Sequence, residues 1–330
     1  MSRKISHSLI SGRAGAGAGG QGLKIGSKGR LYWKDVDEGS LEPVWYGDRG
    51  IFAGGYASAR TDRIEYFAIA TTGNTTDFGN LSEGISRSPG GASSSVRGCY
   101  AGGSTDSTNH IDTIEYITIA TTGNATSFGN LTEANRIHEG LSDGSRGCFG
   151  GGHNGSAYRD VIDYITISTT GNAIDFGNLI NVTDTLGALS NLVRGVWVGG
   201  NGNTDLIQYI TIATTGNASS FGNTSYSNFN KTSGSSDDTK AVYANGATNQ
   251  NIEYITVATT GNATSFGNLT GSGSRSAASC GDGVKAVWAG GYMGGNTNIM
   301  DYVTIQSTGN AVDFGDLAEA RDQLTGLSGD

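Results

Sequence analysis

Residues 114–130 read IEYITIATTGNATSFGN, and close copies of this stretch occur six times in the chain of 330 residues. Successive copies start 50, 48, 45, 45 and 48 residues apart. The starting residues are Ile64, Ile114, Ile162, Ile207, Ile252 and Met300. A period of this length is typical of propellers and other repeat arrays. The repeat therefore has to be explained before any local motif is weighed.

Each copy has the pattern of two short strands joined by a tight turn. β-branched and aromatic residues such as Ile114, Tyr116 and Ile119 interleave with polar ones, which indicates a strand with a buried face. Gly123 and Asn124 suit a tight turn because both residue types accept positive φ at little cost. An apolar residue of the following strand recurs as Phe78, Phe128, Phe176, Phe221, Phe266 and Phe314.

A second motif precedes each copy and usually ends in two glycines. It reads RGIFAGG from residue 49, RGCYAGG from 97, RGCFGGG from 146, RGVWVGG from 194, KAVYANG from 240 and KAVWAGG from 285. A further strand is expected within residues 131–142, leading back to the next copy of this motif. The sequence therefore predicts four short strands per repeat.

Units of this length and pattern, with the double glycine, a Tyr in the third strand and an aromatic residue in the fourth, resemble kelch repeats. The resemblance covers residues 49–330. Kelch repeats usually carry Trp in the fourth strand, where this chain has Phe, and the fifth repeat has Asn245-Gly246 instead of two glycines. Phe fills a similar apolar position, and Asn is the commonest substitute for Gly in left-handed geometry. The resemblance implies a β-propeller.

The two ends of the repeat region indicate how the propeller closes. Residues 317–330 align without a gap on residues 131–144 and stop one residue short of the motif that begins the second strand. The first repeat lacks an initial strand, since it begins at Arg49. We therefore expect an all-β protein, a six-bladed kelch-like β-propeller whose C-terminal residues 317–330 complete the first blade. Such closure removes the free edge of an open array.

Residues 1–48 lie outside the repeat and are interpreted as a Gly-rich N-terminal anchoring arm with a small hairpin around residues 26–29. Gly17, Gly19 and Gly22 have GxGxxG spacing, but no apolar strand precedes them and no helix follows, so a linker is the better interpretation. Residues 1–34 carry +7, and the remaining residues carry −16, because the whole chain carries −9. The arm cations are Arg3, Lys4, Arg13, Lys24, Lys28, Arg30 and Lys34.

This charge division favours docking of the arm on an acidic protein surface and disfavours nucleic acid as a partner. Membrane insertion is not expected either, because no segment is long and apolar enough.

The sequence contains no sign of catalysis. The four histidines lie in unrelated contexts without metal-ligand spacing, so neither a metal nor a cofactor is expected. Some propellers with kelch-like blades are copper oxidases, but the repeated tyrosines here have the periodicity of core residues. Cys99 and Cys148 occupy the same position in different blades, and Cys280 lies elsewhere, so three free buried thiols are expected rather than a disulfide.

One set of loops differs between repeats, whereas the TTGN turn is almost constant. In kelch propellers, the loops after the double glycines share a face with the connections between blades, and divergence on one such face is typical of a recognition surface. Tyr and His can stack on sugars, and Asn and Arg can bond hydroxyls. The alternative is that these are merely solvated loops. The candidate binding residues are Tyr56, His110, Asn154, Tyr158, Arg159 and Tyr292.

The combination of YITIATTGNATSFGNL with the double-glycine motif closely resembles kelch-like repeats in structural proteins of tailed bacteriophages, notably those of marine bacteria and cyanobacteria. The resemblance implies a non-enzymatic virion structural protein, expected in the tail or a fibre, assembled in the host cytoplasm and present in multiple copies per particle. Residues 1–48 would bind other virion proteins, and the variable loops would bind a host-surface glycan or receptor.

Three other functions remain open from the sequence. One is a head decoration or connector protein with a purely architectural role. Another is a free, lectin-like carbohydrate-binding module, and the third is an oxidase or lyase.

Overall fold

The computed structural model describes residues 21–25, 31–35, 46–86, 89–136, 138–201, 205–226, 233–246, 250–270, 276–292 and 294–329. All elements within these ranges are β-strands, and no helix that could cross a membrane is found among them.

The chain divides into two compact units, residues 1–42 and 43–330. In the first, β1 (Gln21–Ile25) pairs antiparallel with β2 (Leu31–Asp35), at the place where the sequence indicates a hairpin. Asp48, which the sequence interpretation assigns to the arm, belongs to the second unit, where its carbonyl accepts a hydrogen bond from Ile69 N at 2.9 Å.

The second unit consists of six four-stranded antiparallel sheets, the blades of a β-propeller. The innermost strands of blades 1 to 6 are β26 (Thr325–Gly329), β6 (Gly90–Ser93), β10 (Glu139–Ser142), β14 (Gly187–Ser190), β18 (Ser233–Ser236) and β22 (Ala278–Gly281). The second strands are β3 (Arg49–Ala53), β7 (Arg97–Ala101), β11 (Arg146–Gly150), β15 (Arg194–Val198), β19 (Lys240–Ala244) and β23 (Lys285–Ala289).

The third strands carry the repeated Tyr and are β4 (Arg63–Ala68), β8 (Thr113–Thr118), β12 (Val161–Thr166), β16 (Leu206–Thr211), β20 (Asn251–Thr256) and β24 (Ile299–Thr304). The outermost strands carry the repeated Phe and are β5 (Thr76–Asn80), β9 (Thr126–Asn130), β13 (Ile174–Asn178), β17 (Ser219–Asn223), β21 (Thr264–Asn268) and β25 (Val312–Asp316).

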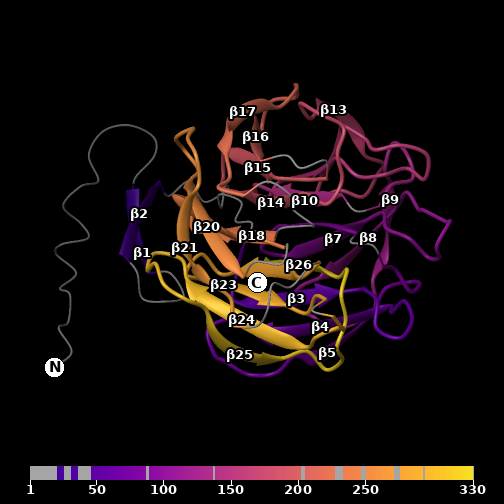
Figure 1. The fold of residues 1–330 in the computed structure, drawn as a ribbon, viewed down its shortest axis with the longest axis horizontal. Helices are drawn as coiled ribbons and strands as arrows, with labels where there is room; N and C mark the ends of the chain where they lie inside the picture. The colour runs from indigo at the N-terminus through magenta and orange to yellow at the C-terminus, as the bar shows by residue number, and fades with distance from the viewer. Residues whose placement is uncertain are drawn as a thin grey trace. The chain divides into compact units, whose positions relative to one another are not determined.

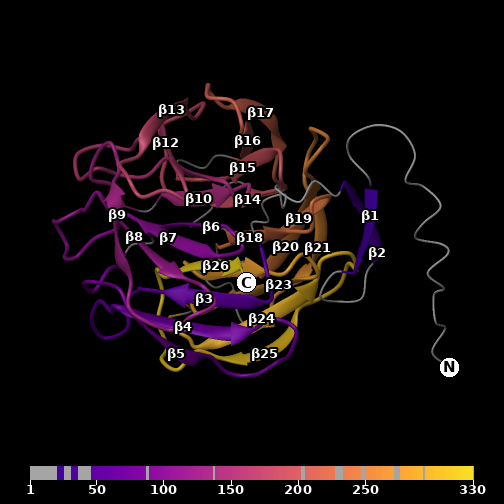
Figure 2. The ribbon, with the colours of Figure 1, turned by 180° about the vertical axis from the view of Figure 1, so that it is seen from behind.

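The ring closes through the last strand of the chain. β26 pairs with β3 over five residue pairs, from Thr325↔Ala53 to Gly329↔Arg49. The two strands lie side by side in Figures 1 and 2, although most of the chain separates them in sequence. The predicted six-bladed propeller closed by its C-terminal strand is therefore confirmed.

The hydrophobic core is divided among the six interfaces between neighbouring blades. At the first of these, Ile51, Ile64 and Phe78 of blade 1 pack against Tyr100 and Ile117 of blade 2. Equivalent clusters occur at the other five interfaces, including the one between blade 6 and blade 1. Both faces of every blade are therefore buried, which explains why consecutive residues of the third strand are buried in each repeat.

The TTGN turn of each blade fastens onto the outermost strand of the preceding blade. In blade 2, Gly123 N donates to Phe78 O and Ala125 N to Asn80 O, both at 2.8 Å. The side-chain Oδ1 of Asn124 accepts a hydrogen bond from Asn80 N at 3.1 Å. We call this set of three hydrogen bonds the inter-blade clasp. It occurs at all six interfaces, and the turn at residues 73–75 fastens blade 1 to blade 6.

A cation at the start of each second strand joins the same interfaces. Arg97 lies over the ring of Tyr116 in its own blade, 4.1 Å from the centroid, and donates to Ile167 O of the next blade at 2.9 Å. The same two contacts recur in the other blades, with Lys replacing Arg in blades 5 and 6. The repeated tyrosines are therefore half-buried between these cations and the outermost Phe rings, whereas the aromatic residues of the second strands are fully buried.

The residue before each repeated Tyr is a buried hydrogen-bond acceptor. In five blades it accepts a backbone N–H from the connection that leaves the preceding blade, as Asp163 does from Thr132 at 3.0 Å. Blade 1 differs, because Glu65 pairs with Arg321 at 2.9 Å and both side chains are fully buried. This ion pair joins the two ends of the propeller.

The propeller has two unlike faces. The turn face carries the TTGN turns, and both ends of the propeller lie there, since Arg49 pairs with Ala68 and with Gly329. The loop face carries the variable loops and the connections between blades. Backbone bridges such as Ser86↔Ser104 and Arg136↔His153 join these two kinds of loop.

The inter-blade clasp leads to a matched pair of glycine substitutions. A Cβ on Gly129 would lie 2.2 Å from Gly171 O, whereas a Cβ on Gly171 would meet nothing within 4 Å. We expect Gly129→Ala to destabilise the protein by about 1–3 kcal/mol, because the turn must move away from the strand. Gly171→Ala should change stability by less than about 0.5 kcal/mol. Urea unfolding of both variants is the measurement, and equal effects would contradict the steric role of the clasp.

The buried ion pair at the closure leads to a second prediction. Arg321→Ala leaves Glu65 buried without its main partner, and we expect a loss of about 3–5 kcal/mol. The double variant Glu65→Gln with Arg321→Ile should recover most of the loss, because Gln208 and Ile85 occupy the equivalent positions in other blades. Chemical denaturation tests both. A double variant no more stable than Arg321→Ala would show that the pair has a further role.

Candidate functional site

Polar side chains from blades 2, 3 and 4 come together on the loop face. His110 lies in the loop between β7 and β8, and Arg136 in the connection from blade 2 to blade 3. His153 and Tyr158 lie in the loop between β11 and β12, and Asp184 in the connection from blade 3 to blade 4. Asn201, after β15, completes the set. We call these six residues the loop-face cluster.

The hydrogen bonds of His110 define its tautomer. Arg136 Nε donates to His110 Nε2 at 3.0 Å, so Nε2 must be the unprotonated acceptor. Nδ1 therefore carries the proton and donates to Ser104 Oγ, also at 3.0 Å. The Ser104 hydroxyl in turn donates to the backbone oxygens of its own loop. His110 is thus a neutral group that fixes the position of the Arg136 guanidinium.

Tyr158 is held at both ends of its side chain. Asn201 Nδ2 donates to the Tyr158 hydroxyl oxygen at 2.8 Å. The Tyr158 ring meets the His153 ring edge to face, with 5.3 Å between centroids, and a backbone bridge links the two residues. Even so, Tyr158 remains 43% exposed. The result is an aromatic ring that is fixed in position and open to solvent.

Asp184 is the buried carboxylate of the cluster. It is 5% exposed, and its Oδ1 atom has no hydrogen-bond partner. Burial raises the pKa of this carboxyl group, although side-chain hydrogen bonds from Asn201 and Thr185 and the charges of Arg136 and His153 oppose the shift. Asp184 therefore presents one acceptor oxygen, Oδ1, that the described residues leave unused.

A charged pair borders the cluster in blade 3. Arg159 Nε contacts Glu133 Oε1 at 2.5 Å, and Asn154 Nδ2 donates to Glu133 Oε2 at 3.2 Å. Together with Arg136 and Asp184, these side chains contribute two positive and two negative charges. The region is consequently polar and close to neutral.

Four of the six predicted binding residues lie in or beside this cluster, namely His110, Asn154, Tyr158 and Arg159. The other two lie at the boundary between blades 6 and 1, where Asn296 Nδ2 donates to Tyr56 O at 2.7 Å and Tyr292 forms a bridge with Asn296. The six predicted binding residues therefore form two separate groups on the loop face. Whether either binds a ligand stays a prediction.

Of the predicted arm residues, Lys24 and Lys34 fall on β1 and β2. Arg3, Lys4, Arg13, Lys28 and Arg30 lie outside the described residues.

Arg136, His153, Asp184 and Asn201 are absent from the sequence-based set. His153 and Asn201 do carry a signal, since each directly follows a double glycine. Arg136 and Asp184 carry no such signal in the sequence. They belong to two different connections between blades, and only the packing of the blades around the ring brings them together. The burial of Asp184 is a tertiary property.

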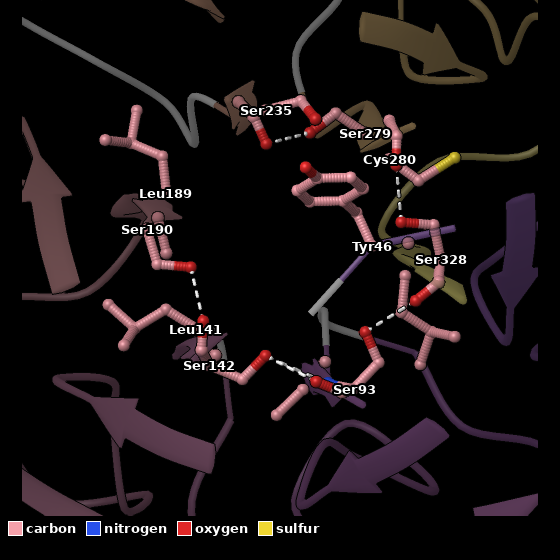
Figure 3. Close-up of a pocket in the computed structure, with 18 of the residues that line it drawn as sticks. Tyr46, Ser93, Leu141, Ser142, Leu189, Ser190, Ser235, Ser279, Cys280 and Ser328 are labelled. Carbon is pink, nitrogen blue, oxygen red and sulfur yellow. Dashed lines mark hydrogen bonds between the residues drawn. The ribbon is translucent and has the colours of Figure 1, made fainter. Parts of the chain in front are cut away.

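The central channel is a second candidate, shown in Figure 3. Five innermost strands place a Ser at the same position, and each Oγ donates to the backbone oxygen at that position in the preceding blade. The donors are Ser93, Ser142, Ser190, Ser236 and Ser328. Blade 6 has Gly281 there, and Ser279 donates to Gly234 O instead.

The channel is too small for an organic ligand. Its volume is about 80 Å³, whereas small-molecule sites occupy roughly 300–1,000 Å³. Tyr46 is among the lining residues and lies against Gly283, on the turn between β22 and β23. We call these five hydrogen-bonded serines of the innermost strands the serine belt. We interpret the belt as a structural link between blades, in addition to the inter-blade clasps.

The three cysteines are free and buried, as expected from the sequence. Burial raises the pKa of Cys99 to about 12, and it also raises those of Cys148 and Cys280. At neutral pH these thiols are protonated and poorly nucleophilic. Among the residues that the structure describes, no group of three or more His, Cys, Asp or Glu side chains could hold a metal ion.

The fold and this site define a six-bladed β-propeller with a polar cluster on its loop face. No protein-family model matches the chain, and no curated protein matches it.

Asp184 allows a test of how the cluster affects stability. Its raised pKa means that the charged carboxylate is less favourable in the folded than in the unfolded state, so it destabilises the fold at neutral pH. We expect Asp184→Asn to raise the melting temperature at pH 7 by about 1–3 °C. The difference should shrink as the pH falls through the raised pKa towards about 3.9, the unfolded value.

Scanning calorimetry between pH 7 and pH 4 measures this difference. Asp322→Asn is the control, because Asp322 has the same position in its connection and accepts hydrogen bonds from Gln323. A lower melting temperature of Asp184→Asn at pH 7 would contradict the prediction.

Proposed function

We propose that this protein is a non-enzymatic structural component of bacteriophage virions, placed in the tail or a fibre. It is anchored by its N-terminal arm and presents the loop face of the propeller to a host surface or a neighbouring subunit. The phage assignment rests on the resemblance of the repeats described above. The propeller fold agrees with this assignment.

The observation that carries the proposal is the difference between the turn face and the loop face of the propeller. The turn face is built from the same clasp six times, and the chain enters the propeller there, at Arg49. The loop face differs from blade to blade and carries the loop-face cluster. In this proposal the N-terminal arm attaches the protein, and the variable face carries out recognition.

The charge distribution supports attachment of the arm to protein. Seven cations and no acidic residue lie within residues 1–34, whereas the rest of the chain carries −16. Opposite charges steer association and favour acidic partner surfaces. An acidic propeller also repels the packaged nucleic acid, which is consistent with a position outside the genome.

A gold-labelled antibody raised against the propeller should locate the protein on intact phage particles by electron microscopy. We expect label at the tail or its fibres. Label over the head or neck would replace this proposal with head decoration. Absence of label from particles would favour a free lectin-like module.

The role of the arm is tested with the full-length chain. Replacing the seven arm cations by Gln should lower incorporation into particles, because the arm loses its attraction to acidic surfaces. The matched control replaces Lys240 and Lys285, which bind backbone carbonyls within the propeller. Quantitative blotting of purified particles measures incorporation. Undiminished incorporation of the arm variant would contradict anchoring by charge.

A further inference from the structure

We propose that the loop-face cluster binds a neutral saccharide, an inference that rests on the proposed recognition role of the loop face. Asp184 accepts hydrogen bonds from sugar hydroxyls, and Tyr158 packs against the apolar face of the sugar ring. Arg136, fixed by His110, and Asn201 position these two groups.

The first argument is the unused acceptor on Asp184. Its Oδ1 is buried, yet it has no hydrogen-bond partner among the residues that the structure describes. A buried acceptor without a partner is unfavourable, and more so when it is charged. A ligand hydroxyl can supply the missing donor and remove part of this cost. Asp322, the equivalent residue between blades 6 and 1, differs because both of its carboxylate oxygens accept from Gln323, at 3.2 and 3.3 Å.

The second argument is the held but exposed ring of Tyr158. Contacts with His153 and Asn201 fix the ring before any ligand binds. A fixed ring loses little conformational entropy on binding, and its exposed surface offers apolar area to the C–H groups of a sugar. Asn201 links the two ends of the site, because its side chain bonds the Tyr158 hydroxyl and its backbone N donates to Asp184 O at 2.9 Å.

The third argument concerns the charge of the ligand. The charge of Arg136 favours the ionised form of Asp184 and lowers its pKa, and Arg159 contacts Glu133. Both cations are therefore compensated, so the cluster has no excess positive charge for an acidic sugar. Hydroxyl donors without a charge fit this balance better, because they satisfy Asp184 without disturbing either pair.

The number of contacts also suggests weak binding by a single copy. One carboxylate, one aromatic ring and a few amides are consistent with a dissociation constant in the millimolar range, about −4 kcal/mol. Several copies on one particle would raise the overall affinity through multivalency. A weak single site is thus compatible with surface recognition by a virion.

The test uses the full chain and saturation-transfer NMR with four neutral probes: the methyl glycosides of glucose, galactose, mannose and N-acetylglucosamine. Methyl glucuronide is the acidic comparison. We expect at least one neutral glycoside to bind, and Asp184→Asn and Tyr158→Ala each to weaken it about tenfold. Two control variants should change binding less than about twofold. They are Asp322→Asn, at the position equivalent to Asp184, and Tyr56→Ala, at the boundary between blades 6 and 1.

Three results would overturn the inference. They are no binding of any neutral glycoside up to about 50 mM, equal losses in the control variants, and tighter binding of the glucuronide. Melting curves of each variant separate loss of the site from loss of the fold.

The particle assay keeps this inference distinct from the proposed function. If particles carry the unaltered protein at the tail but the unaltered chain binds no neutral glycoside, only the saccharide is wrong and a protein ligand replaces it. If the protein is absent from particles but binds the glycoside, the virion role is wrong and the saccharide site stands.

Discussion

The structure depends on each blade burying both of its faces against its neighbours. A single four-stranded blade has no core of its own, because its apolar residues are shared between two interface clusters. The clasp, the cation over the repeated Tyr and the buried acceptor before it all cross the same interfaces. The stability of each blade therefore depends on the whole ring. The interface between blades 6 and 1 must be as well packed as the other five.

The last interface meets this requirement by two devices. β26 supplies the innermost strand of blade 1, and Arg321 reaches Glu65, the only one of the six buried acceptors that the structure pairs with an arginine. Elsewhere a backbone N–H serves the same acceptor. Glu65 thus stands at the position of the buried acceptor found in every blade. At the closure, an ion pair with Arg321 replaces the backbone N–H that serves this acceptor in the other blades.

The loop face has the opposite character, because nothing in the ring constrains the chemistry of its loops. Asp184 illustrates the consequence. Its carboxylate is buried, its pKa is raised, and one oxygen has no partner, so it opposes folding at neutral pH. Residues that break local rules of stability are concentrated at functional sites. This is the physical reason for proposing a binding site at blades 2 to 4 and not in the symmetric channel.

The sequence by itself determined the number of blades, the order of strands and the closure by residues 317–330, because a periodic pattern of apolar residues and glycines can be satisfied by few architectures. It also identified His110 and Tyr158 as loop residues of interest. Only the tertiary structure decided that Tyr56 and Tyr292 lie apart from them, that Arg136 and Asp184 join them, and that serines form a belt around the channel. These contacts join residues from different blades, and their distances depend on the curvature of the ring, which no local pattern in the chain records.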